Sequence, residues 1–205
     1  MSLVKFCGLF RAEDIEYANI LKPDYAGFVF AESRRKITIE QSLHFKNMLD
    51  KNIKTVGVFL NNSAKEILNI CSSNIIDLVQ LHGNISEQFI NEIKLKTNLE
   101  VILAANITKK EDILSLEKSQ ADYVLLDSKK SGSGRQFDYE LLNKALKSGF
   151  QRKYFIAGGI NINNIEEVLK YNPYCIDISS GIEKDGVKNY YLMEEIMKKI
   201  KGAYQ

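Results

Sequence analysis

The sequence predicts a (β/α)8 barrel, in which eight parallel strands close into a ring and each strand is followed by a helix. Eight short apolar runs recur along the 205 residues, about one every 25 residues, which is the spacing of a compact barrel of this class. Most of the runs are continuous rather than alternating, as expected of strands covered on both faces. Several of the segments between them open with a helix-capping pattern, so the chain alternates strand and helix as a parallel sheet requires.

The predicted strands are short and evenly distributed. They lie at Leu3–Cys7, Tyr25–Phe30, Thr55–Leu60, Leu78–Leu81, Val101–Ala104, Tyr123–Leu126, Tyr154–Ala157 and Cys175–Ile178. Capping boxes, in which Ser, Thr or Asn stands three residues before Glu or Gln, predict four helix starts. The pairs are Thr38 with Gln41, Ser63 with Glu66, Thr108 with Glu111, and Asn163 with Glu166.

A doubly wound open sheet is the competing fold, and it is disfavoured. No G-x-G-x-x-G follows the first strand, although a dinucleotide-binding sheet would carry that fingerprint there. The chain has only two prolines and no Pro- or Ser-rich linker. We therefore expect residues 1–205 to form a single domain.

Composition argues against several classes of protein. Lys and Arg number 28 against 26 Asp and Glu, so the net charge is +2, too small to indicate a nucleic-acid or membrane surface. Cys7, Cys71 and Cys175 have none of the spacings of a zinc site or a disulfide framework. The start is a poor signal peptide, and no apolar run approaches the ~18 residues of a membrane helix. We expect a cytoplasmic protein that binds neither nucleic acid nor membrane.

Polar residues gather where the predicted strands end. In a (β/α)8 barrel the active site forms at the carboxyl ends of the strands. The first strand ends at Cys7, the sixth leads directly to Asp127, and the eighth passes through Asp177. The second, fourth and seventh lead into AESRRK, QLHG and AGG. This pattern is typical of an enzyme.

Glycines after the last two strands predict a phosphate site. Backbone amides at Gly158, Gly159, Ser180 and Gly181 would be accessible to an anion because little or no side chain shields them. The simpler interpretation is that the glycines only permit tight turns. Two such turns on neighbouring strands favour phosphate binding.

Alternation along the strands predicts an ion pair beneath the site. Lys5 shares a face of the first strand with Cys7, and Asp177 lies on the eighth strand. These strands are neighbours once the barrel closes. Because a lone buried charge is very costly, we expect Lys5 and Asp177 to meet.

Seven motifs, in order, extend over nearly the whole chain. They are VKFCGL, GFVFAESRRKIT, TVGVFLN, LVQLHG, LLDS with SGSGRQFDY, FIAGGININNI and IDISSGIEKDGVKN. Together they resemble the phosphoribosylanthranilate isomerase family of tryptophan biosynthesis. The chain departs from the family pattern in the glycine loop 131–134, at Tyr139, where the family has Trp, and at Asn189, where an acid is usual.

The resemblance implies a barrel of the ribulose-phosphate-binding type and an aldose–ketose isomerase, an intramolecular oxidoreductase. The implied reaction is an Amadori rearrangement of N-(5-phosphoribosyl)anthranilate to 1-(2-carboxyphenylamino)-1-deoxyribulose 5-phosphate. Asp127 would be the general acid that protonates the furanose ring oxygen, and Cys7 the general base that removes the proton from the neighbouring sugar carbon. Neither a metal nor an organic cofactor is expected.

The resemblance also assigns residues to the substrate. Arg35 matches the position that contacts the anthranilate carboxylate, which a guanidinium suits. From their place at the end of the fourth strand rather than from the resemblance, Gln80 and His82 are expected to line the site; for His82 a structural or substrate-lining role is favoured over that of a general base. Asp177 is expected to orient the ribose hydroxyls or to support Cys7.

Other functions stay open at this point. A related phosphosugar isomerase or epimerase would use the same barrel, but the histidine-pathway type is expected to carry an aspartate in place of Cys7. A non-catalytic barrel that binds a phosphorylated metabolite would need neither Cys7 nor Asp127. The sequence leaves the oligomeric state as monomer or homodimer.

Overall fold

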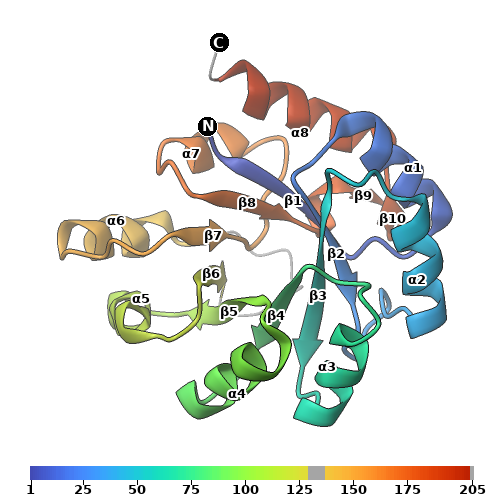
Figure 1. The fold of residues 1–205 in the computed structure, drawn as a ribbon. Coiled ribbons are helices and arrows are strands. Elements are labelled where there is room, and N and C mark those ends of the chain that lie inside the picture. Colours follow the sequence, from blue (N-terminus) through green and yellow to red (C-terminus); the bar gives the residue numbers. More distant parts are fainter. Residues whose placement is uncertain (129–136, 204–205) are drawn as a thin grey trace. The chain divides into compact units, whose positions relative to one another are not determined.

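The computed structural model describes residues 1–128 and 137–203 (Figure 1). Within these residues, eight strands follow one another in sequence order around a closed barrel. Helices alternate with the strands along the chain. The predicted fold class is confirmed.

The observed elements overlap every predicted strand. The barrel strands are β1 (Leu3–Cys7), β2 (Tyr25–Val29), β3 (Lys54–Leu60), β4 (Leu78–His82), β5 (Glu100–Ile107), β6 (Tyr123–Ser128), β7 (Tyr154–Ile156) and β8 (Cys175–Ile178). The α-helices are α1 (Ala12–Leu21), α2 (Ile39–Met48), α3 (Ala64–Cys71), α4 (Glu87–Thr97), α5 (Lys110–Ser115), α6 (Tyr139–Lys147), α7 (Ile165–Leu169) and α8 (Tyr190–Gly202). The short elements are the 3-10 helices η1 (Leu116–Lys118) and η2 (Ser180–Ile182), and the strands β9 (Glu183–Lys184) and β10 (Val187–Lys188).

The chain divides into two compact units. The first contains Phe6–Ala104 and Gln120–Tyr123, and the second contains Met1–Lys5, Ala105–Ser119 and Val124–Gln205. β1, β5 and β6 each have residues in both units. The backbone therefore passes between the units within three strands of the sheet.

In the first unit, β2, β3, β4 and the first half of β5 pair in parallel. Val58, Gln80 and Ile102 stand side by side in register on β3, β4 and β5. His82 comes two residues later, beside Leu60. Since side chains alternate along a strand, Gln80 and His82 share a face of β4 in successive rows toward its carboxyl end.

An ion pair holds the amino-terminal ends of β3 and β4 together. The Asp77 carboxylate, just before β4, accepts hydrogen bonds from the Thr55 N–H (2.7 Å) and hydroxyl (2.9 Å). Lys46 of α2 donates to the same carboxylate oxygen at 2.6 Å. Burial alone would raise the pKa of Asp77, but Lys46 and the two Thr55 donors outweigh it and hold the pKa below its ordinary value.

A similar ion pair links the amino-terminal ends of β5 and β6. The Asp122 carboxylate, just before β6, accepts a hydrogen bond from the Val101 N–H of β5 (2.8 Å) and pairs with Lys94 of α4 (2.7 Å). In both cases a lysine from a helix C-terminal turn meets an aspartate that precedes a strand. Groups at this end of a (β/α)8 barrel serve stability rather than catalysis.

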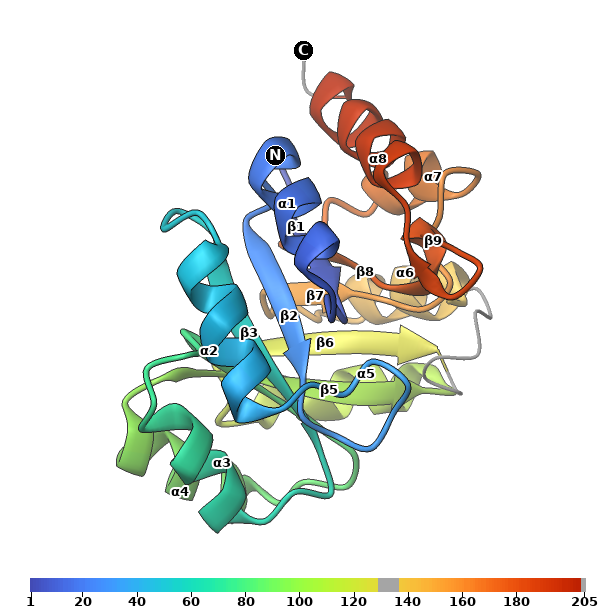
Figure 2. The ribbon, with the colours of Figure 1, turned by 90° about the vertical axis from the view of Figure 1, so that its right-hand side faces the viewer.

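In the second unit, β6 pairs with β7 and β7 with β8, all in parallel. The N–H of Leu3 in β1 donates to the carbonyl of Tyr174 (3.0 Å), just before β8. After β8, η2 leads into the antiparallel hairpin of β9 and β10, which lies at the amino-terminal end of α8 (Figure 2). Asp185 and Gly186 form its turn with φ of +52° and +84°, as a two-residue hairpin requires.

Two of the four predicted capping boxes are confirmed. The Thr38 hydroxyl accepts the N–H of Gln41, and the Gln41 side chain accepts the N–H of Thr38. Ser63 and Glu66 make the same reciprocal pair before α3. Each pair satisfies two amides that the first helical turn leaves without partners.

The boxes predicted at Thr108 and Asn163 are wrong because both helices begin later than expected. α5 starts at Lys110, so the third helical position is Asp112, which accepts the N–H of Thr108 (2.8 Å). α7 starts at Ile165, after a turn in which the Asn161 N–H donates to the Asn164 side chain (2.8 Å).

Candidate active site

Cys7, the last residue of β1, is buried. Gly8 follows with a φ of +75°, and the N–H groups of Gly8 and Leu9 both donate to the carbonyl of Gly27 in β2 (2.9 and 3.1 Å). A Cβ at Gly8 would lie 2.4 Å from Cδ of Arg35. The missing side chain thus lets the Arg35 stem lie against the backbone next to Cys7, so the structure brings these two predicted site residues together.

Gln80 is buried on β4 and only 3% exposed. Among the described residues, its Oε1 atom has no hydrogen-bond partner. A buried acceptor without a partner costs about 1–3 kcal/mol, so it is suited to receive a donor from a ligand. His82, two residues on, is half-buried at the strand end.

Asp127 is the penultimate residue of β6, and its carboxyl group is buried. Its Oδ1 accepts the N–H of Ser128 at 2.7 Å. A Cβ at Gly158, just after β7, would lie 2.9 Å from the Ser128 nitrogen and 3.1 Å from Oδ1 of Asp127. Because Gly158 has no Cβ, the Asp127 carboxylate has room to lie beside it.

The predicted ion pair between Lys5 and Asp177 is confirmed. Nζ of Lys5 lies 2.9 Å from Oδ1 of Asp177, and both side chains are buried. Burial raises the pKa of Asp177, and the negative charge of Asp127 adds to the rise; Lys5 and, more weakly, Lys188 oppose it.

The two glycine turns expected to bind phosphate are in contact. A Cβ at Gly181 in η2 would lie 1.8 Å from the carbonyl oxygen of Ile160, so only glycine fits there. The carbonyl of Gly159 accepts hydrogen bonds from the side-chain amides of Asn161 (2.9 Å) and Asn164 (3.0 Å). These asparagines hold the turn after β7, while η2 packs against it.

The remaining cysteines lie away from the strand carboxyl ends. Cys175 is the buried first residue of β8. Cys71 ends α3 and is partly buried, and burial raises the pKa of its thiol to about 11. Cys71 is therefore protonated at neutral pH.

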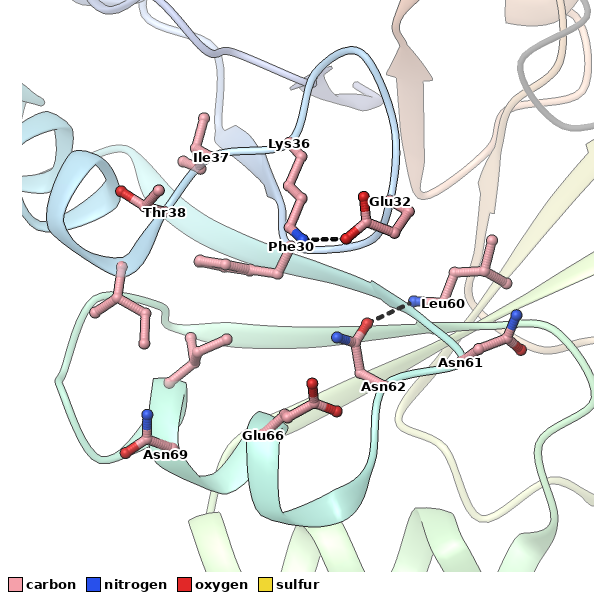
Figure 3. Close-up of a pocket in the computed structure, with 12 residues that line it drawn as sticks. Phe30, Glu32, Lys36, Ile37, Thr38, Leu60, Asn61, Asn62, Glu66 and Asn69 are labelled. Atoms are coloured by element: carbon pink, nitrogen blue, oxygen red, sulfur yellow. Dashed lines mark hydrogen bonds and ion pairs between the residues drawn. The ribbon is translucent and has the colours of Figure 1, made fainter.

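A cavity of about 490 Å³ lies in the first unit, beside the segments that follow β2 and β3 (Figure 3). None of the predicted site residues lines it. Several of its polar side chains already have partners: Lys36 pairs with Glu32, Asn62 accepts the N–H of Leu60, and Glu66 caps α3. These three groups are therefore engaged within the protein.

Within residues 1–128 and 137–203, no three His, Cys, Asp or Glu side chains are grouped as a metal ion would require. No helix in that part of the chain is long and apolar enough to cross a membrane.

The departures from the family pattern have local explanations where the structure describes them. The Asn189 side chain accepts the N–H of Leu192 (3.2 Å) and so caps α8, a role that an acid would also fill. Tyr139 is buried at the start of α6 and stacks on Tyr171, with ring centroids 5.4 Å apart. The glycine loop 131–134 lies outside the described residues.

A closed barrel with a buried thiol, a buried carboxyl group and glycine turns at its strand ends defines a (β/α)8 barrel enzyme. The family model described as N-(5'phosphoribosyl)anthranilate (PRA) isomerase matches residues 4–199. The chain belongs to this family. It is an isomerase of tryptophan biosynthesis, and the family match favours this function over the related epimerase and the non-catalytic barrel.

Similar proteins and solved structures carry the same family name. An N-(5'-phosphoribosyl)anthranilate isomerase from Endomicrobium trichonymphae is 43% identical over 203 residues, covering 97% of this chain and 98% of the relative. One from Thermoanaerobacter sp. (strain X514) is 41% identical, covering 98% and 99%. The crystal structure of phosphoribosyl anthranilate isomerase from Thermus thermophilus has a TM-score of 0.89 at 30% identity, covering 98% of this chain and 99% of that one.

Sequence reasoning missed two residues that shape the site. Gly8 was not singled out, although a glycine directly after a strand-end cysteine is a signal of close backbone packing. Lys188 was also missed; its side chain is fully buried beside η2, and no local pattern indicates that a lysine after a hairpin turn points inward.

Proposed function

We propose that Asp127 and Cys7 carry the isomerisation as general acid and general base. Asp127 gives its proton to the furanose ring oxygen as the bond from that oxygen to C1' breaks, which leaves a Schiff base. The Cys7 thiolate then removes the C2' proton, and the resulting enolamine tautomerises to the ketone. The observation that carries the proposal is that each group is buried at the carboxyl end of its own strand, where barrel enzymes place catalytic residues.

Arg35, Gln80, His82 and Asp177 are proposed to bind the substrate. The Arg35 guanidinium would pair with the anthranilate carboxylate, and its packing against Gly8 supports a fixed position for the stem. The orphan acceptor of Gln80 would take a hydrogen bond from the substrate. Asp177 already pairs with Lys5 through Oδ1, which supports an indirect role beneath the sugar.

Gly158, Gly159, Ser180 and Gly181 are proposed to bind the phosphate through backbone amides. The contact between the two glycine turns supports a single anion site. A solved relative, 28% identical with a TM-score of 0.86, is described in complex with reduced 1-(o-carboxyphenylamino)-1-deoxyribulose 5-phosphate. We extend the binding of such a phosphorylated product to this chain.

The test follows the loss of phosphoribosylanthranilate fluorescence with purified protein. Cys7→Ala and Asp127→Asn should each lower kcat by about 10²–10⁴-fold and leave competitive inhibition by inorganic phosphate intact. Cys71→Ala is the matched control, because it removes a thiol that is protonated at neutral pH, and it should keep full activity. Full activity in Cys7→Ala would refute the assigned base.

The wider setting is also a proposal. We infer that the enzyme works in the cytoplasm, without metal or organic cofactor and without nucleic acid, as a single domain of residues 1–205. Three strands that each have residues in both compact units support one cooperative domain, and a single unfolding transition would test it. Both oligomeric states stay open: a relative from Thermotoga maritima is described as dimeric, and light scattering would distinguish monomer from homodimer.

A further inference from the structure

A buried lysine supports the turn proposed to bind phosphate. Lys188 is the last residue of β10, and its side chain is fully buried. Its Nζ donates to the carbonyl oxygen of Ser179 at 3.0 Å and to Oε1 of Glu183 at 2.8 Å. Glu183 is the register partner of Lys188 across the hairpin, so the hairpin places this ammonium group under the backbone between β8 and η2.

The bond to Ser179 fixes the orientation of one peptide group. No peptide bond in the described chain is cis. In a trans peptide the carbonyl of one residue and the N–H of the next point in opposite directions. Because the Ser179 carbonyl is directed at Lys188, the N–H of Ser180 must point away from the hairpin.

The other side of the same turn is held by packing. Gly181 lies against the carbonyl of Ile160 so closely that a Cβ would come within 1.8 Å of it. The Asn189 N–H donates to the carbonyl of Ile182 at 2.9 Å. The Ile182 N–H also donates to the Ser179 carbonyl, at 3.5 Å. Of these two donors Lys188 is the nearer, at 3.0 Å, so it contributes most to setting the direction of the Ser180 amide.

We propose that Lys188 is a positioning residue for phosphate binding: by holding the Ser179 carbonyl, it aims the Ser180 N–H at the phosphate group of the substrate. This inference rests on the proposed phosphate site. Glu183 balances the lysine charge, so the contribution of Lys188 is orientation of a backbone donor rather than direct contact with the phosphate.

The test must not leave the Glu183 carboxylate buried without a positively charged partner. Replacing Lys188 alone would leave the Glu183 carboxylate buried without its partner, which is strongly destabilising. The informative variant is therefore Lys188→Met with Glu183→Gln. The control is Glu183→Gln alone: it removes the counter-charge of the buried ammonium group and so lowers stability, but it keeps an acceptor oxygen at position 183 and the bond from Lys188 to Ser179.

In the double variant we expect KM for the phosphorylated substrate and the inhibition constant of inorganic phosphate to rise together by about tenfold, the loss of one well-directed hydrogen bond to a charged group. The kcat value should change much less, and the control should keep both constants near wild type. A purely structural role would lower the melting temperature and leave both constants unchanged, and that result would overturn the inference.

A measurement on the unaltered protein covers the case in which the double variant fails to fold. Titration of the ¹⁵N-labelled wild type with inorganic phosphate should shift the Ser180 amide resonance strongly. A Ser180 resonance that stays fixed while phosphate inhibits the enzyme would overturn the inference and leave a phosphate site elsewhere. Absence of any phosphate inhibition of the wild type would remove the proposed phosphate site, and the inference with it.

Discussion

Nζ of Lys5 lies 2.9 Å from Oδ1 of Asp177, and neither side chain has appreciable contact with solvent. The two residues are 172 positions apart in the chain, yet they form an ion pair between β1 and β8. Burial and the nearby Asp127 charge both disfavour ionised Asp177, so the carboxylate depends on Lys5. Lys5 precedes Cys7, the proposed base, by two positions on β1.

Removal of Lys5 should therefore lower the free energy of unfolding by an amount that depends on pH. Lys5→Met is expected to lower the free energy of unfolding by about 3–5 kcal/mol, the usual effect of stranding a buried charge. Without Lys5 the pKa of Asp177 in the folded state rises further above its pKa in the unfolded state. The variant is therefore most stable in acid, and it loses stability as the pH rises from the unfolded-state pKa through the folded-state pKa. Urea unfolding at several pH values measures this, and a deficit that does not change with pH would contradict it. Lys5→Met with Asp177→Leu should recover much of the loss.

Gly8→Ala should weaken substrate binding through Arg35. The new Cβ would lie 2.4 Å from Cδ of Arg35, so the guanidinium must move and KM should rise severalfold, with a smaller change in kcat. Gly149→Ala is the matched control because Gly149 also has a positive φ, +96°, but a Cβ there meets nothing within 4 Å. Both variants should lose about 1 kcal/mol of stability from backbone strain. Equal KM values in the two would contradict the role given to Gly8.

Gly158→Ala should act on kcat as well as on KM, because Gly158 lies against the proposed acid and also belongs to the proposed phosphate site. Its Cβ would press on the Ser128 nitrogen and on Oδ1 of Asp127, which displaces the proposed acid. A displacement well under 1 Å is enough to lower kcat by about tenfold or more, because proton transfer depends on hydrogen-bond geometry. Steady-state kinetics that showed normal kcat in a folded Gly158→Ala protein would argue against this position for the acid.

Gln80→Met is expected to separate stability from activity. The substitution removes the buried Oε1 that has no partner within the described chain, so the free energy of unfolding should rise by about 1 kcal/mol while kcat/KM falls. Gln88→Met, at an exposed position of α4, should change neither by a measurable amount. Loss of stability with unchanged kinetics in Gln80→Met would show that Gln80 serves the fold alone.

Asp77 should contribute to acid stability. Its folded-state pKa is held below the unfolded value, so its contribution is present above the unfolded pKa of about 4 and is lost as the pH falls through the folded value. Because the pair with Lys46 is partly exposed, Asp77→Asn should cost at most about 1 kcal/mol at neutral pH. The difference from wild type in urea unfolding should shrink below about pH 4; Glu32→Gln, an exposed partner of Lys36, should show no comparable trend.

Local patterns in the chain were enough to predict the strands and two helix starts. Apolar runs predict the strands because several consecutive residues of a strand are buried, so the signal lies within a short stretch of sequence. A capping box likewise involves only residues three positions apart. The boxes failed at α5 and α7, where a shift of one residue in the helix start changes which side chain meets the first amides. The end of β5 was missed because Ala105 and Asn106 are less buried than the run before them.

Sequence alone therefore determined the order of eight strands, the residues at their carboxyl ends and, through alternation and the cost of a lone buried charge, the pairing of Lys5 with Asp177. Only the tertiary structure decided that Arg35 lies against Gly8, that Asp127 lies against Gly158, and that Lys188 holds the Ser179 carbonyl. These contacts depend on which side chains and carbonyls point at one another across neighbouring loops. Loop direction follows from packing over the whole fold, and no periodic pattern in the chain encodes it.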